Sequence, residues 1–395
     1  MQNIIFLLTK DCMPCESLPI YGNKYWQTPN IDELAANGTV FKRHYTAGGS
    51  TSMSMSAMLT GHYLYEFDSR KIYVNVKPSE FPSVFDWFQS NEYECHLIWD
   101  VTWINGAWRF VREFGDENKT LIHNLDIAQV TGEHSVDDPL KRDDSLLEKT
   151  YSQIYETLSS ININKKQFIW LHLPHILKGR RSYMDDMDAF DNIVGFVRRR
   201  FGDDSIFLSS DHGHMNLHKG QIGYGFDLYE PIVHIPLITP RIDGLKEISY
   251  LTCNVDLPTL LIEKKAVRRD YVIAETAYYA QPQRKVAIIT DRFKYIYNKH
   301  GRTEEYYDLT WDPNENHNIL KYDYYDKERK QRTIIDEKYF YPYKEEAMEA
   351  LPQLRKIRND MWRDAPLWYE WYGIIRKKLA PIKKLLRVSQ SNIRG

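Results

Sequence analysis

Short apolar runs alternate with segments of helical spacing along the first two thirds of the chain. Ile4–Leu8 is a continuous apolar run, and Phe168–Leu173, Ser205–Ser210 and Ile232–Ile238 are strand-like. Runs of this length predict strands that are buried on both faces of a parallel sheet. Tyr183–Phe201 instead has apolar residues at helical spacing. The alternation predicts an α/β fold in which helices cover both faces of a mainly parallel sheet.

Glycines and hydroxyl residues open one of the expected helices. Gly48 and Gly49 allow a tight turn, and Ser50 or Thr51 can cap a helix that continues to about Leu59. A hydroxyl at a helix N-terminus lies where backbone N–H groups favour an anion, which suits a nucleophile attacking a phosphate or sulfate ester. The alternative is an ordinary surface helix with a serine-rich first turn.

The pattern changes after about residue 270. Residues 285–291 and 293–298 predict an antiparallel hairpin, which indicates a small C-terminal α+β subdomain. We therefore expect a catalytic domain over 1–270, a subdomain over 271–350 and a separate tail over 351–395. The tail holds eleven Lys/Arg and three Asp/Glu, and aromatic residues precede a basic amphipathic stretch. This pattern is typical of membrane-surface helices, although a terminal helix packed on the protein body is equally compatible with it.

Composition limits the class of protein. The chain has 395 residues, 27% of them charged, and its net charge of -2 argues against nucleic-acid binding. Four cysteines are too few for a disulfide framework, and Cys12 and Cys15 are interpreted as packing thiols. The first residues do not resemble a signal peptide, and no stretch has the length of a membrane span. The expectation is a cytoplasmic protein, peripheral at the inner membrane face if the tail binds lipid.

Polar side chains follow several of the expected strands. Asp11 comes after the first apolar run, Asp211 and His212 follow Ser205–Ser210, and Thr51 begins its helix. Oxygen and imidazole ligands of this kind suit a hard or borderline divalent cation. A hydroxyl held by such a cation loses its proton more readily and becomes a nucleophile.

Several segments resemble motifs of one known family, in the family's order. Ser209–Gly213 looks like its "SDHG" signature, Thr28–Phe41 like "TPNLDxLAxxGxxF", and Ser50–Gly61 like "CxPSRxxLLTG". Leu228–Ile238, Val255–Leu261 and Glu305–Asn318 resemble three later motifs. The family is the sulfatase branch of the alkaline phosphatase superfamily. The resemblance implies an alkaline phosphatase-like α/β/α sandwich and places Thr51 at the nucleophile position.

The departures from the family pattern bear on the chemistry. Sulfatases of this branch convert a Cys or Ser to formylglycine, whereas position 51 is Thr. The motif arginine is replaced by Met55, the first of two paired acids by Lys10, and a later lysine by Gly225. A threonine nucleophile resembles the phosphoethanolamine and phosphoglycerol transferases instead.

That resemblance implies roles for particular residues. One divalent metal, Zn or Mn first and Ca or Mg as alternatives, is expected at Asp11, Thr51, Asp211 and His212. Catalytic roles are implied for Thr51, His175 and His234, and substrate contacts for His214, His218, Ser52 and Lys10.

The leading hypothesis is a metal-dependent phosphotransferase or phosphodiesterase that uses Thr51 and passes a phospho-substituent to a glycan or lipid-linked acceptor. The alternative is a sulfatase-like hydrolase of sulfuric or phosphoric esters, and a third is a non-catalytic scaffold of the same fold. The expected partners are a phosphoester substrate, the acceptor and, through the tail, a membrane surface; nucleic acid is not expected, and a homo-oligomer is left open.

Overall fold

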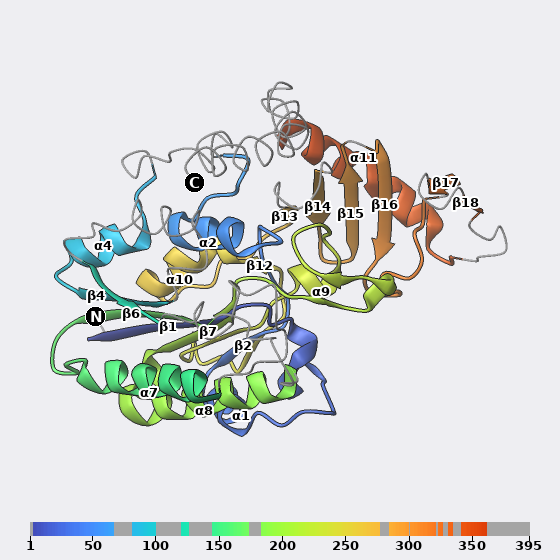
Figure 1. Cartoon of the computed structure of the whole chain (residues 1–395). Helices are drawn as coiled ribbons and strands as arrows, with labels where there is room; N and C mark the ends of the chain where they lie inside the picture. Colours follow the sequence, from blue (N-terminus) through green and yellow to red (C-terminus); the bar gives the residue numbers. More distant parts are fainter. Residues whose placement is uncertain are drawn as a thin grey trace, which may run out of the picture.

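An eight-stranded, mainly parallel sheet forms the centre of the molecule in the computed structural model (Figure 1). The structure describes residues 3–66, 81–99, 120–125, 144–173, 183–276, 284–299, 301–320, 323–326, 331–334 and 341–361. The strand order is β11-β2-β10-β7-β1-β6-β4-β5, and only β10 runs antiparallel to its neighbours. The strands are β1 (Ile4–Lys10), β2 (Thr39–Phe41), β4 (Glu94–Trp99), β5 (Thr120–Asn124), β6 (Gln167–Leu173), β7 (Ile206–Ser210), β10 (Leu237–Thr239) and β11 (Glu247–Ile248).

Helices cover both faces of this sheet, as Figure 1 shows. One layer holds α1 (Pro29–Asn37), α7 (Asp144–Ser160) and α8 (Tyr183–Phe201), and the other holds α2 (Thr51–Thr60), α4 (Val84–Ser90) and α10 (Leu257–Glu263). The alternation of side chains along β1 explains the two layers, because Phe6 and Leu8 pack in one core with α8 while Ile5 and Leu7 pack in another with α2. The predicted α/β fold with a mainly parallel sheet is confirmed.

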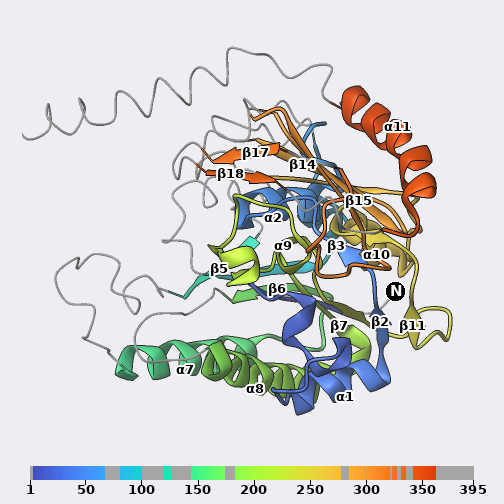
Figure 2. The same ribbon diagram turned by 90° about the vertical axis from the view of Figure 1, so that its right-hand side faces the viewer.

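A second, antiparallel sheet lies beside the first. It consists of β13 (Val272–Glu275), β14 (Lys285–Ile289), β15 (Phe293–Asn298) and β16 (Thr303–Asp308), and α11 (Lys344–Met361) packs on it (Figure 2). The predicted hairpin is the β14–β15 pair. Helix α11 runs across residue 351, where the sequence analysis placed the start of a tail. The basic stretch of that tail lies outside the described residues.

Short elements complete the chain. They are β3 (His44–Tyr45) with β12 (Thr252–Cys253), β8 (Met215–Asn216) with β9 (Ile222–Gly223), β17 (Asp323–Asp326) with β18 (Gln331–Ile334), α9 (Glu230–Val233), and 3-10 turns at Cys15–Ser17, Pro19–Tyr21, Asp203–Ser205, His218–Gly220 and Asn254–Asp256. All four cysteines are buried thiols. Among the described residues, no helix is both long and apolar enough to cross a bilayer.

The strand predicted over Ile232–Ile238 is wrong except at its last two residues. Residues Glu230–Val233 form helix α9, and the strand begins only at Leu237. Pro231 lies in the first turn of that helix, where its fixed φ is compatible with helical backbone and its missing N–H is not needed.

Candidate active site

Neighbouring parallel strands bring Asp11 and Asp211 together. In β1 and β7, Lys10 is in register with Ser210, so the next residue of each strand leaves the sheet at the same edge. Asp11 and Asp211 are both buried, with exposed fractions of 2% and 0%. Ligand sites of open α/β sheets lie at this carboxyl edge of the strands.

The glycine turn before α2 brings Thr51 to the same edge. A Cβ at Gly48 would lie 2.5 Å from the Cβ of Met53, so only glycine fits this turn. Ser50 is the extended residue before the helix, and Thr51 is its first residue. The Ser54 hydroxyl donates to the backbone oxygen of Asp211 at 2.6 Å, which fixes the first turn of α2 against the end of β7.

Three oxygen atoms surround one nitrogen of His212. The Nε2 atom lies 3.1 Å from Thr51 Oγ1 and 3.5 Å from both Asp11 Oδ1 and Asp211 Oδ2. The other ring nitrogen, Nδ1, lies 2.9 Å from the Gly213 carbonyl oxygen, to which it can donate. That hydrogen bond leaves Nε2 with a lone pair directed at the three oxygens. The structure thus brings together all four residues expected to bind a metal.

The environment of Asp211 fits a cation. Its Oδ2 atom is buried and has no hydrogen-bond partner among the described residues. Burial raises the pKa of this carboxyl to about 7, although His212 and the Thr51 hydroxyl oppose that rise. A buried carboxylate of this kind is stabilised by a positive charge, and the set of two carboxylates, a hydroxyl and an imidazole matches a hard or borderline divalent ion.

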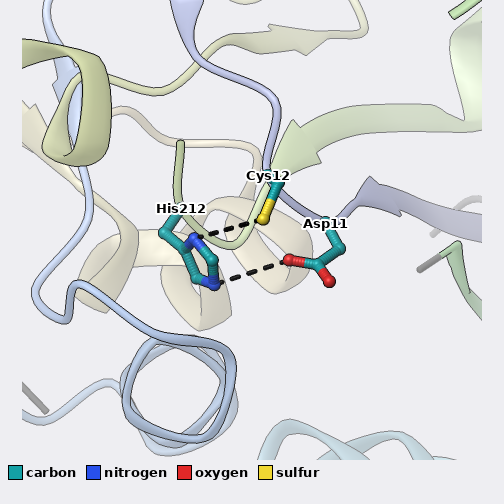
Figure 3. A group of neighbouring side chains, drawn as sticks. All are labelled: Asp11, Cys12 and His212. Atoms are coloured by element: carbon teal, nitrogen blue, oxygen red, sulfur yellow. Dashed lines mark hydrogen bonds and ion pairs between the residues drawn. The ribbon is translucent and has the colours of Figure 1, made fainter. Parts of the chain in front are cut away.

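Cys12 is a neighbour of the cluster that the sequence analysis did not include. Asp11, Cys12 and His212 each offer a ligand atom within 4.8 Å of the others. Figure 3 shows the thiol on the Nδ1 side of the imidazole, 4.0 Å from that atom, and the Asp11 carboxylate on the Nε2 side. Cys12 therefore faces the opposite edge of the ring from Thr51. The only feature of the sequence that could have placed Cys12 near the cluster is its position directly after Asp11.

Tyr224 is a second neighbour that the sequence did not reveal. Its ring centroid lies 4.4 Å from that of His212 and 6.1 Å from that of His214. This ring contact places His214, a predicted substrate contact, near the cluster and next to Tyr224. His214 Nδ1 lies 3.1 Å from Asn216 Oδ1. Ser52 follows Thr51 in the first turn of α2, and its carbonyl accepts the Ser56 hydroxyl at 2.7 Å.

Lys10 is directed away from this cluster. Its Nζ forms an ion pair with Asp186 of α8 at 2.6 Å, and both side chains are buried. Lys10 continues the alternation of Phe6 and Leu8, which face α8, and this parity places it on the opposite face from α2. The structure therefore does not bring this predicted substrate contact to Thr51.

Two predicted histidines line a separate cleft of about 800 Å³. His234 Nε2 lies 2.8 Å from the Lys42 carbonyl oxygen, and its ring stacks on Tyr45 at 5.0 Å. The ring of His218 lies 5.8 Å from that of Tyr229. Burial lowers the pKa of both histidines. None of these contacts reaches the His212 cluster, and His175 lies outside the described residues.

Comparison with known proteins agrees with the fold. Residues 2–259 match the family model described as Sulfatase. The chain belongs to the sulfatase family. Among curated relatives, the ulvan-active sulfatase of Formosa agariphila is 22% identical over 75% of this chain and 60% of its own length. Human N-acetylgalactosamine-6-sulfatase is 42% identical over 14% of this chain and 11% of its own length. The chain thus spans less than two thirds of these sulfatases.

Solved structures of the superfamily share the same architecture. The phosphonate monoester hydrolase of Agrobacterium radiobacter has a TM-score of 0.63 and 14% identity, covering 91% of this chain and 96% of its own. A protein solved in complex with its substrate D-glucosamine-2-N,6-O-disulfate has a TM-score of 0.66 and 15% identity, covering 93% of this chain and 99% of its own. At these identities the likeness establishes the fold of this sulfatase-family chain.

Proposed function

We propose that this chain is a metal-dependent hydrolase of sulfuric or phosphoric esters in which Thr51 is the nucleophile. The observation that carries the proposal is the convergence of Thr51, Asp11 and Asp211 on Nε2 of His212, at 3.1 to 3.5 Å. Family membership supports an ester hydrolase more than the phosphotransferase that the sequence analysis favoured. The two curated relatives quoted above are named as sulfatases and one structural neighbour as a phosphonate monoester hydrolase.

The residues of the cluster have distinct roles in this mechanism. The divalent cation would be held by Asp11, Asp211, His212 and Thr51. Its positive charge would lower the pKa of the Thr51 hydroxyl and offset the negative charge of the ester. The Thr51 hydroxyl lies 3.1 Å from His212 Nε2, and this contact orients it. The Thr51 hydroxyl gives up its proton to water as its Oγ attacks the central sulfur or phosphorus atom. The bond from that atom to the ester oxygen breaks, and this oxygen takes a proton from water as the alcohol leaves.

The start of α2 assists the same step. Thr51 is the first residue of this helix, so the backbone N–H groups of its first turn have no partner within the helix. Those groups and the helix dipole favour the negative charge of the ester oxygens. His214 lies next to Tyr224, and we assign it a contact with the ester or the departing alcohol. Water then cleaves the Thr51 ester.

The threonine at the nucleophile position sets this chain apart within its family. Formylglycine is made from Cys or Ser, so the resemblance implies that this chain attacks the ester directly instead. The substrate proposed here is therefore an ester of sulfate or phosphate type whose leaving alcohol comes from a glycan. A glycan is favoured because one structural neighbour was solved with a sulfated sugar as its substrate.

A panel of chromogenic esters tests the proposal. The purified protein is assayed on p-nitrophenyl sulfate, p-nitrophenyl phosphate, its diester and a p-nitrophenyl phosphonate, each with Zn, Mn, Mg or Ca. We expect at least one ester to be hydrolysed, with loss of activity in EDTA and recovery on addition of metal. Turnover only when a second alcohol is supplied as acceptor would favour the transferase. A metal-loaded protein that hydrolyses none of them would favour the scaffold.

A further inference from the structure

The ring of Tyr224 shields the imidazole at the centre of the candidate site. The two ring centroids are 4.4 Å apart and the planes are tilted by 33°. His212 has no exposed surface, whereas Tyr224 is partly exposed. The tyrosine ring thus lies against a candidate metal ligand while part of its surface is exposed.

A fixed loop presents this ring. Gly223 and Gly225 flank Tyr224, and both have left-handed φ values, +112° and +83°. A side chain at either position would be strained, so the Gly-Tyr-Gly sequence is suited to this backbone shape. The loop is held at one end by the pairing of Gly223 with Met215. At the other end the Asp227 carboxylate forms an ion pair with Lys285 Nζ at 2.6 Å.

The same loop reaches the turn that precedes the nucleophile. A Cβ at Gly49 would lie 3.3 Å from the carbonyl oxygen of Asp227. Residues 224–227 therefore run from the face of His212 to the Gly-Gly turn that positions Thr51. Apolar side chains are exposed on the hairpin that carries this loop, since Leu217 is 70% and Ile222 is 67% exposed. A partly exposed aromatic ring beside a polar centre is a surface against which a ligand can pack.

We propose that Tyr224 is a specificity-determining residue whose ring forms the wall on which a cyclic leaving alcohol, a sugar or an aryl group, packs. This rests on the proposed function, because the Thr51 cluster must hold the charged end of the ester. The apolar face of a sugar and the face of an aryl ring both match an aromatic side chain. A stacked pair of rings adds about 0.5–1.5 kcal/mol beyond area burial, which corresponds to up to about tenfold in affinity.

Non-hydrolysable probes isolate this contact. Phenylphosphonate and methylphosphonate carry the same charged group and differ in the ring, and a glucose-derived phosphonate distinguishes a sugar from an aryl preference. Their dissociation constants are measured calorimetrically on the metal-loaded protein. We expect one or both cyclic probes to bind about tenfold more tightly than methylphosphonate.

The variants then assign that preference to a residue. Tyr224→Ala should bring the ratio of affinities close to one, and Tyr224→Phe, which retains the ring, should preserve it. Tyr25→Ala removes an 88% exposed ring from a surface loop and serves as the matched control, with the ratio unchanged. Circular dichroism and metal content are measured for every variant.

Two results with the variants would overturn the proposal. One is an unchanged ratio in folded, metal-loaded Tyr224→Ala; the other is an equal loss for all probes, which would mean that Tyr224 only supports His212. A wild-type protein that binds cyclic probes no better than methylphosphonate, or binds none, also contradicts it. If the preference depends on Tyr224 but no ester is hydrolysed, the proposed function fails alone. If esters are hydrolysed and the preference is independent of Tyr224, only this inference fails.

Discussion

Replacing Asp211 by asparagine should stabilise the metal-free protein and reduce the stabilisation that a bound metal adds. In the folded chain without metal, burial raises the pKa of Asp211 from 3.8 to about 7. The unfolded chain holds this proton less tightly, so folding becomes less favourable as the pH rises from 3.8 to 7. At about 1.36 kcal/mol for each pKa unit, the upper limit of this destabilisation is about 4 kcal/mol.

Asparagine removes that charge and retains the shape of the side chain. In EDTA at pH 8, Asp211→Asn should therefore raise the free energy of unfolding by up to about 4 kcal/mol, and the gain should vanish at pH 4. A metal at one hundred times its dissociation constant should stabilise the wild type by about 2.7 kcal/mol and the variant much less. Urea unfolding at both pH values, with EDTA or with each metal, measures all of these quantities.

One pattern of unfolding data would exclude this role of Asp211. If Asp211→Asn destabilises the metal-free protein at pH 8, and metal raises the free energy of unfolding of both proteins equally, Asp211 is neither an unfavourable buried charge nor a metal ligand. Asp270→Asn, at an exposed position, is the matched control and should change neither the pH dependence nor the response to metal.

Three further predictions concern the frame around the site. Lys10→Met should destabilise the fold by about 3–5 kcal/mol because it removes the buried Lys10–Asp186 ion pair, and kcat/KM of the folded fraction should change little. A large loss of kcat/KM without a fall in Tm would restore Lys10 as a substrate contact. Burial lowers the pKa of His44 from 6.5 to about 3. The contribution of the neutral ring to the free energy of unfolding is therefore fully present above pH 6.5 and is lost as the pH falls toward 3, by about 2 kcal/mol at pH 5. His44→Asn should flatten that dependence in urea unfolding at pH 7.5 and 5, and an unaltered slope would exclude His44 as its source. Gly213→Ala should cost about 3 kcal/mol, because its Cβ would lie 2.0 Å from the Pro231 carbonyl oxygen, and a wild-type Tm in this variant would contradict the packing described here.

The parts of the fold that sequence pattern could predict are those decided by local chemistry. Ile4–Lys10 is apolar and buried along nearly its whole length, and the Gly-Gly-Ser-Thr turn opens α2 at Thr51 as expected. The polar residues after β1 and β7 could be placed together because adjacent parallel strands end at one edge of the sheet. That rule and the family motifs together were enough to gather Asp11, Thr51, Asp211 and His212.

The parts that the sequence could not predict depend on side-chain direction and on distant contacts. Lys10 and Asp11 are adjacent in sequence, yet Lys10 is directed to the α8 face, where Asp186 is 176 residues away. The contact of Tyr224 with His212 depends on two left-handed glycines, whose effect on ring placement is not visible in a hydrophobic pattern. His234 has the expected sequence context, but its ring packs on Tyr45 in a different cleft.

The most direct test of Thr51 as a metal-assisted nucleophile is the turnover of two variants at this single position. Thr51→Val keeps the shape of the side chain and lacks the hydroxyl, whereas Thr51→Ser keeps the hydroxyl. With metal content confirmed for each protein, kcat/KM is measured on whichever ester the wild type hydrolyses best. We predict that Thr51→Val loses at least about a thousandfold and that Thr51→Ser remains within about tenfold of the wild type. Turnover by metal-loaded Thr51→Val at the wild-type rate would contradict the account.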